Sequence, residues 1–172
     1  MKPNALDQTR YPDSPNPNSV NDGMEFQDFV MDQLRIQKGW FIQVYTSAAR
    51  QLNQGESAQS AEIKLDSRCT ETGRLSIEIY EKTRADRFDW TASGILINPP
   101  PTLYIQGNKT CFWVFHTKDL RQYYAGLIRG RDDKIVTMPT IKTFYIPIVQ
   151  ANSLAMFQVR NTEGQYKLFN WH

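Results

Sequence analysis

Carboxylates and lysines recur at every second position in two short segments that flank a polar turn. Glu62, Lys64 and Asp66 lie in the first segment, and Glu78 and Lys82 lie in the second. Because residues two apart on a β-strand share a face, a hairpin of the two segments sets these acids and amines side by side on one sheet face. That arrangement suits a divalent metal ion and phosphodiester chemistry.

The expected hairpin has strands at 61–66 and 74–81, with Gly73 in the turn. A turn centred near residue 70 pairs Glu62 with Glu78 and leaves Lys64 diagonally beside Glu78. Two carboxylates opposite each other repel unless a cation lies between them, so this pairing indicates a metal ion.

Cleavage of a phosphodiester requires neutralised charge on the phosphate and an activated water, and Mg²⁺ supplies both. Mg²⁺ prefers oxygen ligands, commonly one or two carboxylates, and keeps several waters. We therefore expect Glu62 and Glu78 to hold Mg²⁺, with Mn²⁺ as a substitute and Asp66 as a further ligand. Lys64 or Lys82 would position the attacking water or stabilise the developing charge.

The elements around this hairpin can be predicted from hydrophobic spacing and turn residues. Apolar residues at helical spacing predict a helix that begins at Asn21-Asp22-Gly23 and ends at Gly39. We expect a strand over 40–45 and a loop over 46–59. Beyond the first hairpin, we expect a second hairpin of 103–106 and 111–115 across Gly107-Asn108, a helix from Lys118 with Thr117 as N-cap, a strand over 143–149 and a short helix over 151–157. The order predicts an α/β domain on a mixed or mainly antiparallel sheet.

Composition is that of one domain with an N-terminal tail. The chain has 172 residues, and its first part is rich in Pro, Asn, Asp and Ser, so we expect a flexible tail at 1–22 and a folded domain at 23–172. The net charge of +2 neither requires nor excludes a nucleic-acid partner. Without a signal peptide or a membrane-spanning run, we expect a cytoplasmic location and reduced Cys69 and Cys111.

The helix, the strand and the acidic hairpin together resemble the PD-(D/E)XK nuclease superfamily, whose core is a central mixed β-sheet flanked by helices. The resemblance covers residues 24 to about 82, and GESAQSAEIKLD…GRLSIEIYEK is similar to phage-encoded members. It implies a restriction-endonuclease-like fold, a Mg²⁺-dependent endonuclease activity on DNA, and a bacterial or phage-infected host cell. Many members carry a helix glutamate near the metal, and Glu25 has that position here.

The sequence departs from the family pattern on the second strand. The triplet at Glu78 reads Glu-Ile-Tyr, so Tyr80 stands where the family has lysine. Lys64, across the hairpin, or Lys82, two residues further on, would supply the amine. The alternative is a catalytically inactive DNA-binding or phage-assembly protein on the same fold, and a third reading is an unrelated binding module with a charged surface.

Basic residues follow the hairpin and are interleaved with aromatic residues, a pattern that suits a nucleic-acid surface. We expect DNA contacts from five arginines: Arg84, Arg87, Arg121, Arg129 and Arg131. A homodimer is a further possibility, because many nucleases that cut both strands are dimers. No residue pattern identifies a dimer face.

Overall fold

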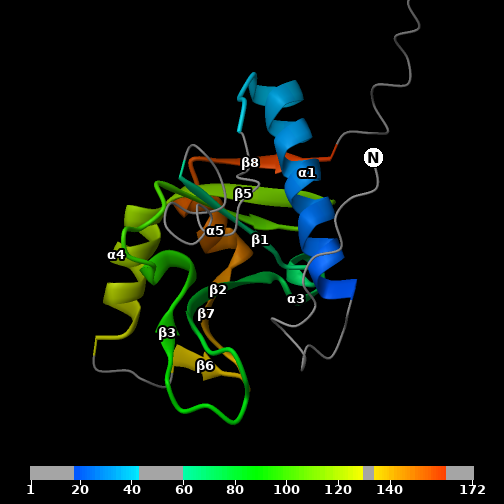
Figure 1. Ribbon diagram of the computed structural model, residues 1–172. Helices are drawn as coiled ribbons and strands as arrows, with labels where there is room; N and C mark the ends of the chain where they lie inside the picture. The colour runs from blue at the N-terminus through cyan, green and yellow to red at the C-terminus, as the bar shows by residue number, and fades with distance from the viewer. Residues whose placement is uncertain (1–17, 43–59, 130–133, 162–172) are drawn as a thin grey trace, which may run out of the picture.

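The computed structural model of the chain describes residues 18–42, 60–129 and 134–161. Within these ranges the protein has an α/β fold with two four-stranded sheets, one mixed and one antiparallel, and helices packed on them. Figure 1 shows α1 at one side of the molecule and α4 at the other.

The mixed sheet has the strand order β1-β4-β5-β8. Its strands are β1 (Ala61–Leu65), β4 (Leu103–Gly107), β5 (Cys111–His116) and β8 (Phe157–Arg160). Strand β1 runs parallel to β4, whereas β4 and β5, and β5 and β8, are antiparallel. β4 and β5 are almost entirely buried, as expected for strands covered on both faces.

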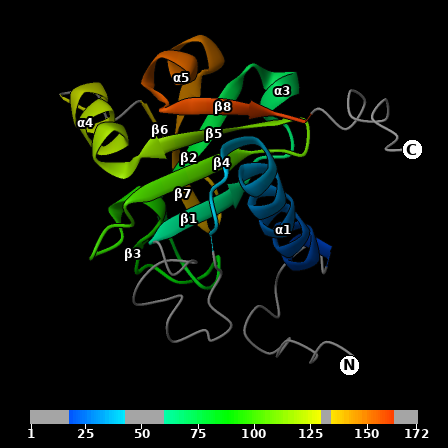
Figure 2. The ribbon, with the colours of Figure 1, turned by 90° about the horizontal axis from the view of Figure 1, so that it is seen from above.

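Helix α1 (Asn18–Lys38) covers one face of the mixed sheet, as Figure 2 shows. Phe26, Val30 and Leu34 recur every fourth residue and are fully buried, so they form one stripe of the helix. They pack against the side chains that β1, β4, β5 and β8 direct to this face, among them Ile63 and Phe112.

The antiparallel sheet has the strand order β3-β2-β7-β6. Its strands are β3 (Thr91–Ala92), β2 (Arg74–Glu81), β7 (Ile141–Pro147) and β6 (Ile135–Thr137). Two longer helices, α4 (Thr117–Leu127) and α5 (Ile148–Leu154), pack into the core that joins the two sheets. Two short helices connect the strands: α3 (Cys69–Thr72) and the 3-10 helix η2 (Gly94–Leu96).

The expected hairpin of 61–66 and 74–81 is wrong, although both strands exist. β1 pairs with β4 and β2 pairs with β7, so the two strands belong to different sheets. The link between them contains α3 and is therefore not a tight turn. The backbone N–H of Asp66 still donates to Gly107 O at 2.7 Å, which continues the pairing of β1 with β4 and directs the chain away from a hairpin.

The second hairpin, β4 and β5, is confirmed across Gly107-Asn108. The helix end at Gly39 is also confirmed: Gly39 has φ +67, and its N–H donates to Arg35 O at 3.1 Å, as in an αL capping motif. Helix α1 begins at Asn18, earlier than expected. Residues 1–17 of the predicted tail lie outside the described residues.

The remaining differences concern element boundaries. Residues 40–42 are not in a strand, and the rest of the predicted strand and the loop at 46–59 lie outside the described residues. Helix α4 begins at Thr117 itself with His116, whose backbone is extended, as N-cap, and the Thr117 N–H donates to Thr102 O. Strand β7 ends at Pro147, helix α5 starts at Ile148, and the strand Phe157–Arg160 was not predicted.

Candidate active site

Three of the residues selected from the sequence lie together in the structure. The Nζ of Lys64 is 3.0 Å from Oε1 of Glu62 and 3.7 Å from Oε1 of Glu78. The side chain of Glu62 is 5% exposed and that of Glu78 is 13% exposed. We call these three residues the Glu–Lys–Glu cluster; its two carboxylates are largely withdrawn from water and share one ammonium group.

The alternation of each strand directs these side chains to the junction of the two sheets. On β1, Ile63 packs against α1, so Glu62 and Lys64 lie on the opposite face. On β2, Ile77 and Ile79 belong to the core with α4 and α5, so Glu78 lies on the other face. The cluster therefore joins the mixed sheet to the antiparallel sheet.

Ser93 holds Glu78 from the loop before η2. Its hydroxyl donates a hydrogen bond to Glu78 Oε1, and its backbone N–H donates to Ile79 O at 2.9 Å. Gly94 follows with φ +53, and a Cβ at this position would lie 2.3 Å from Glu78 O. Only glycine permits this backbone approach, which places the Ser93 hydroxyl on the carboxylate.

Replacement of Gly94 by alanine is expected to lower the free energy of unfolding by at least about 2 kcal/mol, because the residue would be strained and would overlap the backbone of β2. Urea denaturation measures the change. Gly126→Ala is the matched control: it lies in α4 with open space around it and is expected to raise stability by about 0.5–1 kcal/mol. Equal effects of the two substitutions would contradict the argument.

Burial is the largest influence on the ionisation of Glu62 and Glu81. It raises the pKa of Glu62, and the negative charge of Glu78 adds to the rise, whereas the charge and hydrogen bond of Lys64 oppose it. Burial also raises the pKa of Glu81, with further contributions from Glu78 and Glu62, while Lys64 and Ser93 act in the opposite direction. The charges of the cluster therefore influence the pKa of Glu81.

The raised pKa of Glu62 predicts a pH dependence of stability. Below 4.5, its ordinary pKa, the carboxyl is protonated in both states. As pH rises through 4.5 to the raised folded-state pKa, only the unfolded chain releases this proton, so the free energy of unfolding falls by up to about 1.4 kcal/mol per pH unit. Urea denaturation between pH 4 and 7 should show that Glu62→Gln lacks this fall.

Glu25→Gln provides the control for that titration. The pKa of Glu25 is lowered by its hydrogen bond and charge interaction with Lys109. Its contribution to stability is therefore present above pH 4.5 and is lost as pH falls through the lowered pKa, which is the opposite direction. Parallel curves for wild type and Glu62→Gln across the whole range would show that Glu62 ionises normally.

Two buried hydroxyl groups flank the cluster in the strand register. Tyr104 pairs with Glu62 between β4 and β1, and Thr143 pairs with Glu78 between β7 and β2. Neither Tyr104 OH nor Thr143 Oγ1 has a well-aligned hydrogen-bond partner among the described residues. Burial raises the pKa of Tyr104, with the charge of Glu78 next in size, and an interaction with the Glu78 backbone partly opposes the rise.

Asp66, expected as a further metal ligand, binds backbone donors instead. Its Oδ2 accepts from Ser76 N at 2.9 Å and lies 3.4 Å from Gln106 Nε2. Burial raises its pKa, and backbone hydrogen bonds from Ser76, Arg68 and Cys69 oppose the rise. Asp66 therefore anchors the start of β2 to the end of β1, next to the cluster.

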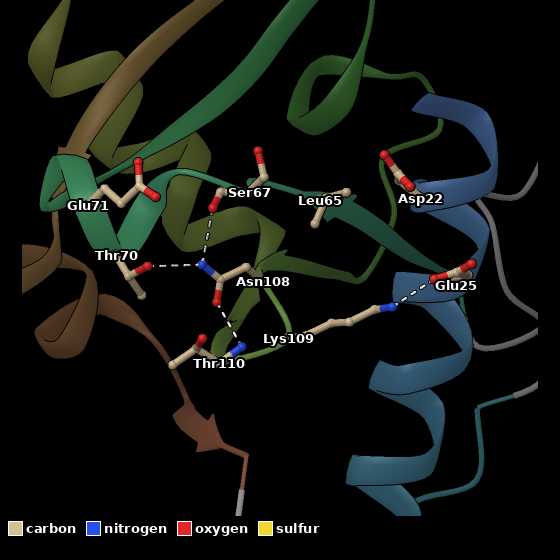
Figure 3. A pocket seen from close by; sticks show the side chains of 9 residues that line it. All are labelled: Asp22, Glu25, Leu65, Ser67, Thr70, Glu71, Asn108, Lys109 and Thr110. Carbon is tan, nitrogen blue, oxygen red and sulfur yellow. Dashed lines mark hydrogen bonds and ion pairs between the residues drawn. The ribbon is translucent and has the colours of Figure 1, made fainter. Parts of the chain in front are cut away.

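Lys82 and Glu25 have partners of their own. The Nζ of Lys82 donates to Ala85 O at 2.8 Å and to Arg87 O at 2.9 Å, which closes the loop after β2. Glu25 pairs with Lys109 at 2.8 Å across a different pocket, between α1 and the β4–β5 turn, as Figure 3 shows. Of the two lysines considered for the site, Lys64 is the one in contact with the glutamates.

The five arginines selected as DNA contacts have different surroundings. Arg121 is partly buried and donates to Ile95 O and Ile97 O, so it ties α4 to η2. Arg84 pairs with Asp86 at 3.1 Å in an exposed loop. Arg87 and Arg129 are exposed, and Arg131 lies outside the described residues.

Sequence reasoning missed Ser93, Glu81, Tyr104 and Thr143. Ser93, Tyr104 and Thr143 lie on elements distant in sequence from β1 and β2, so no local spacing relates them to Glu62 or Glu78. Glu81 is three residues after Glu78, which in regular alternation is the opposite face, but the register of β2 shifts between Glu78 and Tyr80. The irregular register has no signal in the residue types.

Glu62 and Glu78 are the two residues of the cluster that could hold a Mg²⁺ ion. Two largely buried carboxylates face a single cationic group, and one or two protein carboxylates are the usual complement for Mg²⁺. Within residues 18–42, 60–129 and 134–161, no group of three or more His, Cys, Asp or Glu side chains is arranged to hold a metal ion.

Fold and site together define an α/β protein with a buried Glu–Lys–Glu cluster at the junction of two sheets. No family model, curated protein or solved structure matches the chain. None of the helices in the described part is both long enough and apolar enough to cross a membrane.

Proposed function

We propose that this protein is a Mg²⁺-dependent DNA nuclease that hydrolyses phosphodiester bonds at the Glu–Lys–Glu cluster. The observation that carries the proposal is the position of the Lys64 ammonium, 3.0 Å from Glu62 and 3.7 Å from Glu78. Two acids and one amine held close together are the minimum set for metal-assisted cleavage of a phosphodiester.

Glu62 and Glu78 would hold the metal, which when bound neutralises phosphate charge and activates a water. Ser93 fixes the Glu78 carboxylate by its hydrogen bond, so the carboxylate needs little reorganisation. Lys64 is 27% exposed and therefore accessible to a substrate oxygen while it is held beside both acids. Its role would be to orient the attacking water or to stabilise the charge that develops on the phosphate.

The PD-(D/E)XK resemblance supports this proposal in one respect and departs from it in another. In support, Lys64 can take the role that Tyr80 leaves open, since it approaches Glu78 from β1. The departure is topological: β1 and β2 are not neighbours in one sheet. We still include a restriction-endonuclease-like core in the proposal, because helix α1 covers one face of the mixed sheet.

The test is cleavage of supercoiled plasmid and of labelled oligonucleotides with Mg²⁺ or Mn²⁺, with EDTA as control. We expect nicked or linear product that depends on the metal. Absence of cleavage of every DNA form, together with absence of Mn²⁺ binding by calorimetry, would overturn the proposal.

The second candidate is a catalytically inactive DNA-binding or phage-assembly protein, which the tyrosine at position 80 favours. It predicts DNA binding that weakens with salt and no metal-dependent cleavage. Exposed arginines such as Arg84 and Arg87 are compatible with both candidates, so cleavage decides between them.

A further inference from the structure

The face of β2 that carries Glu78 extends away from the Glu–Lys–Glu cluster as far as Arg74. Leu75 and Ile77, which alternate with the residues of this face, belong to the core. Arg74, Ser76 and Glu78 therefore share the opposite face of the strand, on which Arg74 is exposed. Arg74 is four residues before Glu78, which is about 13 Å along the strand. An exposed arginine thus lies on the same face as the proposed chemistry.

Tyr145 of β7 holds the guanidinium of Arg74 in place. Strands β2 and β7 lie side by side (Figure 1), and Tyr145 is opposite Ser76, the next residue of the same face. The Cζ atom of Arg74 lies 3.8 Å from the centre of the Tyr145 ring, which is a cation–π contact. At this distance the flat guanidinium stacks on the ring, and its five N–H donors remain for other partners.

Arg74 has no acidic partner among the residues that the structure describes, since no Asp or Glu carboxylate lies within ion-pair distance of it. The other charged groups near the start of β2 are engaged: Asp66 accepts the backbone N–H of Ser76 at 2.9 Å, and Arg68 is paired with Glu71 at 3.9 Å. Arg74 therefore combines a held position with a positive charge that no carboxylate neutralises. A planar guanidinium in that state suits an anion with two oxygens to offer, such as a phosphate.

The distance from the cluster indicates which phosphate that is. In the proposed function, Glu78 holds the metal ion at the phosphate that is cut. Every nucleotide of a DNA strand carries one phosphate, so a strand bound at Glu78 also offers phosphates along the face that leads to Arg74. A separation of about 13 Å corresponds to at most about four nucleotides of one strand. Arg74 is therefore within reach of a phosphate close to the bond that is cut.

We propose that Arg74, held by Tyr145, binds a backbone phosphate of the DNA strand that is cut at the Glu–Lys–Glu cluster, and this rests on the proposed nuclease function. Arg74 is then a positioning residue: it fixes the strand relative to Glu78 and takes no part in the breaking of the bond. Phosphates carry no sequence information, so the contact aligns DNA of any sequence. The substrate must extend beyond the cut on the side of Arg74.

The experiment measures DNA binding in EDTA, so that it does not depend on cleavage. Fluorescence polarisation of two labelled duplexes of unrelated sequence, at salt concentrations from about 50 to 200 mM, gives the slope of log K against log salt. Arg74→Ala is expected to weaken binding of both duplexes about 5-fold at the lowest salt and to reduce the slope by about 1, because one phosphate contact is lost. Tyr145→Leu should weaken binding about 2-fold, because the guanidinium is no longer held.

Arg35→Ala is the matched control, because it removes one positive charge from a different element. Arg35 is 53% exposed on α1 and pairs with Asp32 at 3.2 Å. We expect this variant to keep the wild-type slope. Arg74→Lys should also keep it, since the charge is retained although the stacked fork is lost. A wild-type slope for Arg74→Ala would overturn the proposal, and so would an equal fall in slope for Arg35→Ala.

Cleavage with Mg²⁺ separates this contact from the nuclease function. Arg74→Ala should raise KM about 5-fold and leave kcat within about 2-fold of wild type, because the lost contact is made in the bound state and in the transition state alike. A large fall in kcat with unchanged KM would overturn the positioning role. If the slope depends on Arg74 but wild type cleaves no DNA, the nuclease function fails and the phosphate contact stands. If wild type cleaves DNA and the slope does not depend on Arg74, the contact fails and the nuclease function stands.

Discussion

Replacement of Glu78 by glutamine is expected to lower the rate of Mg²⁺-dependent DNA cleavage by about 10³-fold. Glu78 is one of the two carboxylates in the Glu–Lys–Glu cluster, and its Oε1 accepts from Ser93 and lies 3.7 Å from Lys64. Glutamine keeps the shape and an oxygen acceptor for Ser93, but removes the charge that attracts a metal ion. The expected fall in rate is of the size found when a charged group that acts at the reacting phosphate is removed.

Single-turnover cleavage of a labelled oligonucleotide measures the rate, and Mn²⁺ calorimetry measures the metal affinity. Glu71→Gln is the matched control, because its side chain is 73% exposed on α3 and pairs with Arg68 at 3.9 Å, away from the cluster. We expect the control to cleave at the wild-type rate. A Glu78→Gln protein that folds, binds DNA and still cleaves at more than a tenth of the wild-type rate would remove Glu78 from the chemistry.

The sequence predicted the cluster although it predicted the wrong pairing of strands. Alternation on a strand decides which face a side chain takes, whatever strand lies beside it. Glu62 and Lys64 therefore had to lie opposite Ile63, and Glu78 opposite Ile77. The two polar faces meet at the junction of the sheets, as they would have met in a hairpin.

Pairing itself could not be predicted from the segment alone. β1 is parallel to β4, and the partner strand lies about forty residues further on, at Leu103–Gly107. Local spacing carries no information on such contacts, since a parallel pair needs a long connection. The contact of Ser93 with Glu78 could not be predicted either. It depends on the close approach of Gly94 to the backbone of β2, which local spacing does not indicate.

Residues with nearby backbone acceptors or donors were the ones whose roles were hardest to predict. Lys82 binds the carbonyls of its own loop, and Asp66 accepts backbone N–H groups at the start of β2. Both have the residue types of a metal site, but local hydrogen bonds of this kind compete with such a role. Residue type and face select candidates, and competing hydrogen-bond partners decide among them.

Replacement of Lys64 by methionine is expected to separate catalysis from metal binding. Cleavage should fall by about 10²–10⁴-fold, because the amine that orients water or stabilises charge is lost. Mn²⁺ affinity should stay equal or increase, because the ammonium 3.0 Å from Glu62 no longer competes for the carboxylates. Without metal, the variant should be less stable, since Glu62 loses the partner that opposes the rise of its pKa and takes up a proton at a higher pH than in wild type.

The metal should restore part of that stability, because a bound cation takes the place of the ammonium. Thermal unfolding with and without Mn²⁺ tests this: the rise in melting temperature should be larger for Lys64→Met than for wild type. If the methionine variant is too unstable to assay, Lys64→Arg replaces it, because arginine keeps the positive charge. We expect Lys64→Arg to cleave DNA at least about 10-fold more slowly than wild type, since a guanidinium neither loses its proton nor reproduces the ammonium geometry. Lys109→Met, which breaks only the exposed pair with Glu25, is the control for loss of a lysine. Full cleavage by both Lys64 variants would mean that Lys64 only neutralises the glutamates, and the amine of the reaction would then have to come from elsewhere.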